Sequence, residues 1–114
     1  MLRKNSRVVA VILVIALSSV QVLAQKRIRF QRGKSSATVR GPIGAGGYTE
    51  YVIDGRAGQV MTIEITSGNG AVVVNAGTAS GKSFSIDMTG GDHLLSVVNT
   101  GRRATNYTLT VSIR

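Results

Sequence analysis

The sequence predicts an all-β domain over residues 25–114, a compact antiparallel β-sandwich of about eight strands with jelly-roll character. Three observations support this fold class. Short runs of β-branched and aromatic residues recur along the chain, and Gly, Asn and Asp separate them. No segment repeats its apolar residues at the helical period of 3.6. A chain of this length encloses a single core, so we expect one domain.

The expected strands cover residues 27–30, 37–40, 48–54, 60–66, 71–75, 83–88, 93–99 and 106–113. Alternation is clearest in the last run, where every second residue from Tyr107 to Ile113 is apolar, and in the run that contains Phe84, Ile86 and Met88. Such alternation indicates one packed face and one solvated face, as two antiparallel sheets packed together require. Residues 71–74 are continuously apolar, which predicts a central strand covered on both faces.

The connections between these runs are rich in glycine, at residues 41–47, 55–58, 68–70 and 90–91. Glycine suits tight turns because it adopts positive φ without steric cost. The alternation also predicts which side chains form the core: Phe30, Tyr51, Ile63, Ile65, Val73, Phe84, Ile86, Leu95, Val97, Tyr107, Leu109 and Val111.

Residues 1–24 have the three-part layout of a secretory signal peptide. Arg3, Lys4 and Arg7 form a basic start, residues 8–17 are apolar, and the segment ends at Ala24, after which we expect cleavage. The apolar run is shorter than the about 20 residues of a membrane-spanning helix. We therefore expect a protein of the periplasm or the extracellular space. The chain has no cysteine, so packing alone must hold the exported domain together.

The charge of the domain favours anionic partners. The whole chain carries +9, and without the three cations of the signal segment the domain carries +6. Outside the cytoplasm, this charge fits an acidic protein surface, an anionic glycan or a membrane surface, and it also promotes solubility. We do not expect nucleic acid as a partner, because export removes the usual targets and few aromatic residues are present for base stacking.

Residues 76–83 match the relaxed pattern of a nucleotide-binding phosphate loop. That loop works because a helix follows it and points its amide groups at the phosphates. Here residues 84–88 alternate as a strand. We therefore expect a hairpin that displays Lys82, and no bound nucleotide.

Nothing in the sequence predicts an enzyme. Asp92 and His93 are adjacent, and neighbours on a strand point to opposite faces, so Asp92 does not orient the ring of His93 as a catalytic triad requires. The remaining carboxylates show no spacing that pairs them. One histidine and no cysteine make a poor metal site. We expect neither a cofactor nor a metal.

Four segments resemble a known family. They are residues 29–37, which contain the pattern Phe-x-x-Gly-x-Ser-Ser-Ala, Tyr51 followed by residues 57–59, Gly91-Asp92-His93 before an apolar strand, and the closing run 107–113. Together they are similar to the periplasmic inhibitors of goose-type lysozyme. The second half also resembles the bacterial pre-peptidase C-terminal domains, which share the fold.

The resemblance implies a protein partner, namely a lysozyme, whose cleft is occluded by inserted loops. In the family, a Ser-Gly-x-Tyr loop enters the cleft, and residues 90–93 align with it, keeping the glycine and placing His93 at the tyrosine. A second family loop precedes the last strand. The resemblance therefore implies a partner-binding surface at one end of the sandwich, formed by Gly91, Asp92, His93, Arg102 and Arg103.

Two other functions stay open on the sequence. One is an accessory module of the pre-peptidase kind, which would bind anionic glycan or the envelope surface. The other is a structural protein of the envelope.

Overall fold

The computed structural model describes residues 25–114, so the predicted signal peptide lies outside the described residues. Over this range the chain forms strands and no helix, and hence no helix of the described part is suited to crossing a membrane. The nine strands are β1 (Lys26–Arg27), β2 (Ser36–Ile43), β3 (Tyr48–Gly55), β4 (Val60–Ser67), β5 (Val72–Ala76), β6 (Ala79–Gly81), β7 (Ser83–Asp87), β8 (Gly91–Asn99) and β9 (Thr105–Ile113).

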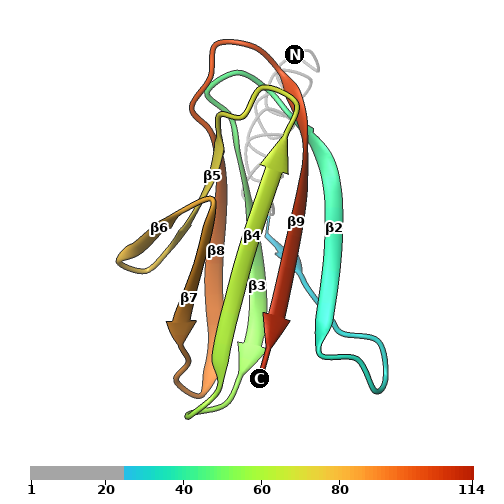
Figure 1. The fold of residues 1–114 in the computed structure, drawn as a ribbon, viewed down its shortest axis with the longest axis vertical. Coiled ribbons are helices and arrows are strands. Elements are labelled where there is room, and N and C mark those ends of the chain that lie inside the picture. The colour runs from blue at the N-terminus through green and yellow to red at the C-terminus, as the bar shows by residue number, and fades with distance from the viewer. Residues whose placement is uncertain (1–24) are drawn as a thin grey trace, which may run out of the picture.

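The strands form two facing sheets, which confirms the predicted all-β sandwich (Figure 1). One sheet, sheet A, has the order β1-β3-β8-β5-β6, and the other, sheet B, has the order β2-β9-β4-β7. From β2 to β5, successive strands alternate between the sheets. Strand β2 pairs with β9 along its whole length, from Ser36↔Ser112 to Ile43↔Thr105. This strand order is that of a jelly roll.

The core lies between the sheets, where side chains from alternate strand positions meet. Ile63, Leu95, Val97, Leu109 and Val111 are fully buried there, as the alternation predicted. Tyr51 of sheet A and Tyr107 of sheet B reach across the interface, and their hydroxyl groups lie 2.6 Å apart in a buried hydrogen bond.

Three predicted core residues are only half-buried at the margin of the core: Phe30, Phe84 and Ile86. Phe30 follows the short strand β1, and the other two lie on β7, the outermost strand of sheet B. Edge strands have one side open, so their inward residues are covered less completely than those of central strands.

The prediction for residues 71–75 is wrong in phase. Val72 and Val74 face the core, whereas Val73 is half-buried on the outer face. The strand is therefore not covered on both faces. The run of three valines conceals the period of two, because every position is apolar and only the packing decides which positions point inward.

Two short strands also differ from the prediction. At the N-terminus, β1 has two residues and runs parallel to β3, with Lys26 opposite Tyr51. The strand β6, which the sequence did not predict, pairs with β5 through a turn at Gly77, whose φ of 61° suits glycine. The strand β7 follows it where the phosphate-loop pattern would need a helix, as the alternation predicted.

Candidate functional site

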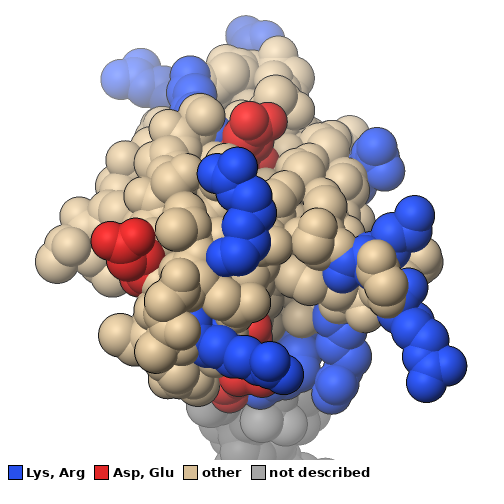
Figure 2. All heavy atoms as spheres, turned by 60° about the horizontal axis from the view of Figure 1, so that its bottom comes forward, with Lys and Arg blue, Asp and Glu red and all other residues tan. Residues whose placement is uncertain are grey.

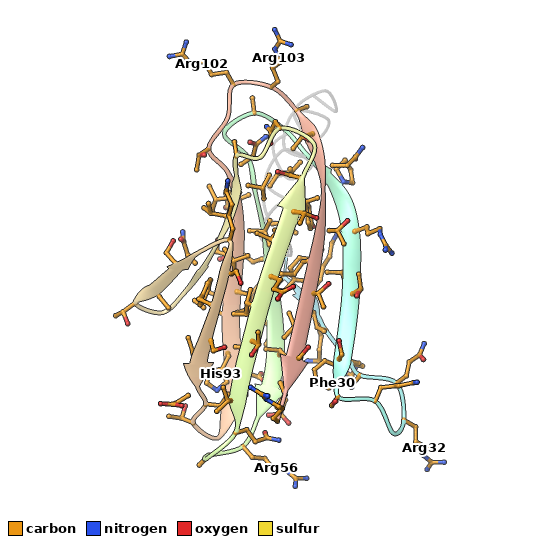
Figure 3. The ribbon with its side chains drawn as sticks, viewed as in Figure 1. Phe30, Arg32, Arg56, His93, Arg102 and Arg103 are labelled. Atoms are coloured by element: carbon orange, nitrogen blue, oxygen red, sulfur yellow. The ribbon has the colours of Figure 1, made fainter. Side chains whose placement is uncertain are left out.

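The five residues predicted to bind a partner are divided between the two ends of β8. Figure 3 shows His93 at the opposite end of the sandwich from Arg102 and Arg103. His93 is near the start of β8, whereas Arg102 and Arg103 follow its end. Gly91 and Asn99 are the first and last of the nine residues of β8, and they lie about 26 Å apart at about 3.3 Å per residue. The expectation of a single surface is therefore wrong, because the two segments flank one strand rather than meeting beside it.

We name the two ends by their loops. The upper end consists of residues 44–47, 68–71 and 100–104, and the lower end consists of the turns 56–59 and 88–90, as seen in Figure 1. The backbone connects the loops within each end. The amide of Asn99 donates to the carbonyl oxygen of Gly47 at 3.0 Å, and the amide of Gly58 donates to that of Met88 at 3.3 Å.

At the lower end, the predicted residues contact other parts of the same chain. The guanidinium of Arg27 donates two hydrogen bonds to the carboxylate of Asp92, at 2.9 and 2.7 Å. This bonding, together with the charge of Arg27, holds the pKa of Asp92 below its usual value. The ring Nε2 of His93 lies 2.9 Å from the carbonyl oxygen of Thr89, within the turn that precedes β8. Gly91 has a φ of 97°, which favours glycine at that turn. Contacts within the chain therefore hold Asp92 and His93, and backbone conformation accounts for Gly91.

At the upper end, one buried asparagine joins three loops. The side-chain amide of Asn99 is fully buried and donates to the carbonyl oxygens of Gly44 at 3.1 Å and Arg103 at 2.8 Å. Its side-chain oxygen accepts from the amide of Gly101 at 2.9 Å and from the side chain of Asn69 at 3.3 Å. Four bonds therefore fix the path of the 100–104 loop against its neighbours.

This loop has little room for change beneath its backbone. A β-carbon at Gly101 would lie 2.8 Å from the side-chain nitrogen of Asn69 and 3.1 Å from the side-chain oxygen of Asn99. The side chain of Thr100 adds a bond of 2.7 Å to the carbonyl oxygen of Ala71. The upper end is therefore a rigid platform.

The platform presents cationic side chains to solvent. Arg102 and Arg103 are both exposed and project away from the body of the sandwich (Figure 3). None of the five acidic residues of the described chain lies in the three upper loops. An arginine pair without neighbouring carboxylates is suited to binding carboxylates or other anions of a partner.

Within residues 25–114, no group of three or more His, Cys, Asp or Glu residues lies close enough together to hold a metal ion. The only ion pair among these residues is the one between Arg27 and Asp92. With Asp92 held by Arg27, it does not orient the ring of His93.

Comparison of the structure with solved structures identifies similar proteins. The PliG inhibitor of g-type lysozyme from Aeromonas hydrophila has a TM-score of 0.67 and 20% identity, over 80% of this chain and 96% of that one. The chain shares the fold of the PliG lysozyme inhibitors. PliG from Salmonella Typhimurium follows, with a TM-score of 0.62 and 21% identity over 79% and 97% of the two chains.

The same fold occurs in a pre-peptidase C-terminal domain, that of a collagenase from Bacillus anthracis. Its TM-score is 0.58 and its identity 17%, over 79% of this chain and 94% of that domain. No protein-family model matches the chain, and neither does a curated protein sequence. Both resemblances seen in the sequence therefore hold at the level of the fold.

Asn99 is the residue of this region that the sequence analysis missed. It ends an alternating strand in an Asn-Thr-Gly segment that reads as an ordinary turn. One signal was available: position 99 continues the inward phase of Leu95 and Val97, and a polar residue at an inward position needs hydrogen-bond partners.

Proposed function

We propose that this protein is an exported inhibitor that occludes the cleft of a protein partner, a lysozyme, with the upper end of its sandwich. The observation that carries the proposal is the exposed pair Arg102 and Arg103 on a loop fixed by the buried Asn99. The fold shared with PliG inhibitors supports the choice of partner. Export rests on the signal segment that the sequence predicts in residues 1–24.

The chemistry of inhibition follows from charge and rigidity. A glycosidase cleft contains carboxylates, and the planar guanidinium of arginine binds a carboxylate through two parallel hydrogen bonds. A loop that is already ordered loses little conformational entropy when it binds, so more of the contact energy appears as affinity. The protein acts by blocking access and performs no chemical step itself.

The test is an inhibition assay of the domain 25–114 against a panel of lysozymes that includes g-type enzymes. Replacing both Arg102 and Arg103 by Ala should weaken inhibition at least tenfold, about 1.4 kcal/mol, with little change in melting temperature. The matched control replaces Arg32 and Arg56 by Ala, which removes the same charge away from the upper end (Figure 3). An equal loss of inhibition in both double variants would mean that net charge alone causes the effect. Full inhibition by the Arg102/Arg103 double variant would show that the upper end is not the inhibitory surface.

The binding role predicted for Gly91, Asp92 and His93 now concerns a separate surface, at the lower end of the sandwich. Asp92→Asn tests that role, since it removes the partner of Arg27 while it keeps the shape of the side chain. We expect full inhibition by this variant. A tenfold loss would move the inhibitory surface to the lower end.

A second candidate function is glycan binding by the outer face of sheet B. Hydroxyl groups form a row across all four strands, because Ser36 pairs with Ser112, Ser112 with Thr62, and Thr62 with Ser85. A hollow of about 530 Å³ lies on the same sheet, four residues farther along the strands, and Arg40, Thr66 and Thr108 are among the residues that line it. Hydroxyl groups and one guanidinium suit an acidic sugar.

Binding to insoluble peptidoglycan separates the two functions. Retention of the domain that falls when Arg40→Ala is introduced, and that persists in the Arg102/Arg103 double variant, would favour the glycan-binding function. Retention that disappears equally in every variant that lacks a cation would indicate only non-specific charge.

A further inference from the structure

The outer edge of β2 has no partner strand among residues 25–114. Strand β2 pairs with β9 on one side only and ends the order of sheet B. Backbone groups of alternate residues point to opposite sides of a strand, and the amide of Ile113 donates to the carbonyl oxygen of Ser35 at 2.9 Å. Residues 35, 37 and 39 therefore point to β9, and the N–H and C=O groups of Ser36, Thr38 and Arg40 point outward.

These outward backbone groups have no backbone hydrogen bond within the described chain. Exposed strand edges are the part of a sheet most prone to pair with another chain, and native proteins block them with proline or bulges. Here Pro42 lacks an N–H and ends the row of donors. The open stretch from Ser36 to Arg40 is long enough to form backbone hydrogen bonds with about three residues of one added strand.

A hollow of about 550 Å³ lies along this edge, between β2 and the segment that follows β1. Ile28, Ala37 and Val39 line its apolar part, and Ser36 and Thr38 line its polar part. Ala37 and Val39 are half-buried, because no strand covers them on this side. An added strand would therefore place every second side chain on an apolar surface and the others beside Thr38 and Arg40.

The charge at the groove selects an acidic occupant. Arg29 and Lys34 line the hollow and are exposed, and neither forms an ion pair within the described residues. Arg40 lies on the same strand edge. Seen from the lower end, Lys and Arg side chains gather on the side that carries the β1–β2 connection (Figure 2). Pairing of this edge with a second copy of the chain would bring like charges together, which disfavours a dimer here.

We propose that the edge of β2 binds an extended acidic segment of a protein partner by strand addition. Main-chain hydrogen bonds to Ser36, Thr38 and Arg40 hold the segment, and its alternate apolar side chains enter the hollow. Its acidic side chains face Arg29, Lys34 and Arg40. This site is separate from Arg102 and Arg103, so it does not depend on the proposed inhibition.

The test uses labelled peptides with the domain 25–114. The probe is a seven-residue peptide of alternating Glu and Val, and its fluorescence anisotropy reports binding. The control peptides are the same sequence N-methylated at every second amide, once in each register, and a heptaglutamate. We expect one methylated register to lose at least tenfold in affinity and the other to bind as the parent peptide does, because only one edge of the peptide pairs with β2. Heptaglutamate should bind weakly and lose its binding in salt.

Variants of the domain locate the site. Replacing Arg29 and Lys34 by Ser should weaken peptide binding at least tenfold, whereas the Arg102/Arg103 double variant should bind as the wild type does. Thr38→Pro removes one outward N–H, and the edge position tolerates it because that group has no partner in the fold. If this variant does not fold, as circular dichroism would show, amide shifts at 36, 38 and 40 on peptide addition replace it as the measurement.

Two results would overturn the proposal. The first is equal binding of the parent, both methylated peptides and heptaglutamate, since attraction would then be purely electrostatic. The second is a concentration-dependent dimer of the free domain that protects the amides of 36, 38 and 40 from hydrogen exchange, since the edge would then serve a second copy.

Discussion

Replacing Asn99 by Ala should destabilise the domain by about 3 kcal/mol. The variant removes three hydrogen bonds to the backbone of the upper loops, at the carbonyl oxygens of Gly44 and Arg103 and the amide of Gly101. The carbonyl oxygen of Gly44 keeps its bond from the amide of Gly47 at 2.9 Å, whereas the amide of Gly101 is left without a partner. A buried neutral hydrogen bond contributes about 1 kcal/mol net, and an abandoned partner costs at least that much. Asn99 itself is fully buried, and its bonds to Gly44, Arg103 and Gly101 are partly buried.

Urea denaturation of both proteins measures this effect, and Asn75→Ala is the matched control. Asn75 is an exposed asparagine whose side chain bonds only to the side chain of Ser80, so the loss of stability in Asn75→Ala should stay within about 0.5 kcal/mol. Hydrogen exchange should also quicken in residues 100–104 of the Asn99 variant and stay unchanged in residues 88–90. A loss below about 1 kcal/mol for Asn99→Ala would refute the reasoning that this side chain holds the upper loops.

Three further predictions concern the core and the lower end. Leu109→Ala should cost about 2 to 5 kcal/mol in denaturation, since Leu109 is fully buried between the sheets, and a loss below about 0.5 kcal/mol would contradict its placement. In a double-mutant cycle, Tyr51→Phe and Tyr107→Phe should each destabilise the domain more than the double variant does, because each single change leaves one buried hydroxyl unpaired. Burial and this bond raise the pKa of Tyr51, so the stability of the wild type should fall above about pH 10, where the unfolded chain ionises and the folded one does not. This decrease in stability should be absent from Tyr51→Phe. The depressed pKa of Asp92 gives the opposite sign: the contribution of its pair with Arg27 is present above about pH 4 and is lost as the pH falls further, so thermal melting of Asp92→Asn should depend less on pH in that range, and an unchanged pH dependence would contradict the ion pair.

The alternation of side chains was sufficient to predict most of the sandwich. In the last strand, every second residue from Tyr107 onward is apolar, and these residues are the buried ones. Alternation failed where it carried no information. Val72, Val73 and Val74 are all apolar, so either phase fits the sequence, and the packing of β5 beside β8 decides that Val73 faces outward.

The predicted strands already implied that the two predicted binding loops are separated. Both loops flank one strand, which the sequence predicted at residues 93–99. That predicted strand alone places His93 and Arg102 at its opposite ends. The family resemblance favoured one surface, and the geometry of an extended strand rules it out. The role of Asn99 was hidden for another reason, since its partners are backbone groups of loops distant in sequence.

The contact between Arg27 and Asp92 could not be predicted from the sequence either. The two residues are 65 positions apart, and they meet because β1 and β8 pair with opposite edges of the same strand, β3. This pairing turned a predicted binding residue, Asp92, into one with a structural partner. Local patterns predict strands well, whereas such contacts depend on which strands become neighbours.

Mapping the contact surface on the domain decides whether the upper end of the sandwich binds the lysozyme. Amide chemical shifts of the domain 25–114 are measured with and without a lysozyme that it inhibits. We expect the changes to centre on residues 44–47, 68–71 and 100–104 and to disappear in the Arg102/Arg103 double variant. Changes that centre on residues 56–59 and 88–93, with the upper loops unaffected, would contradict it.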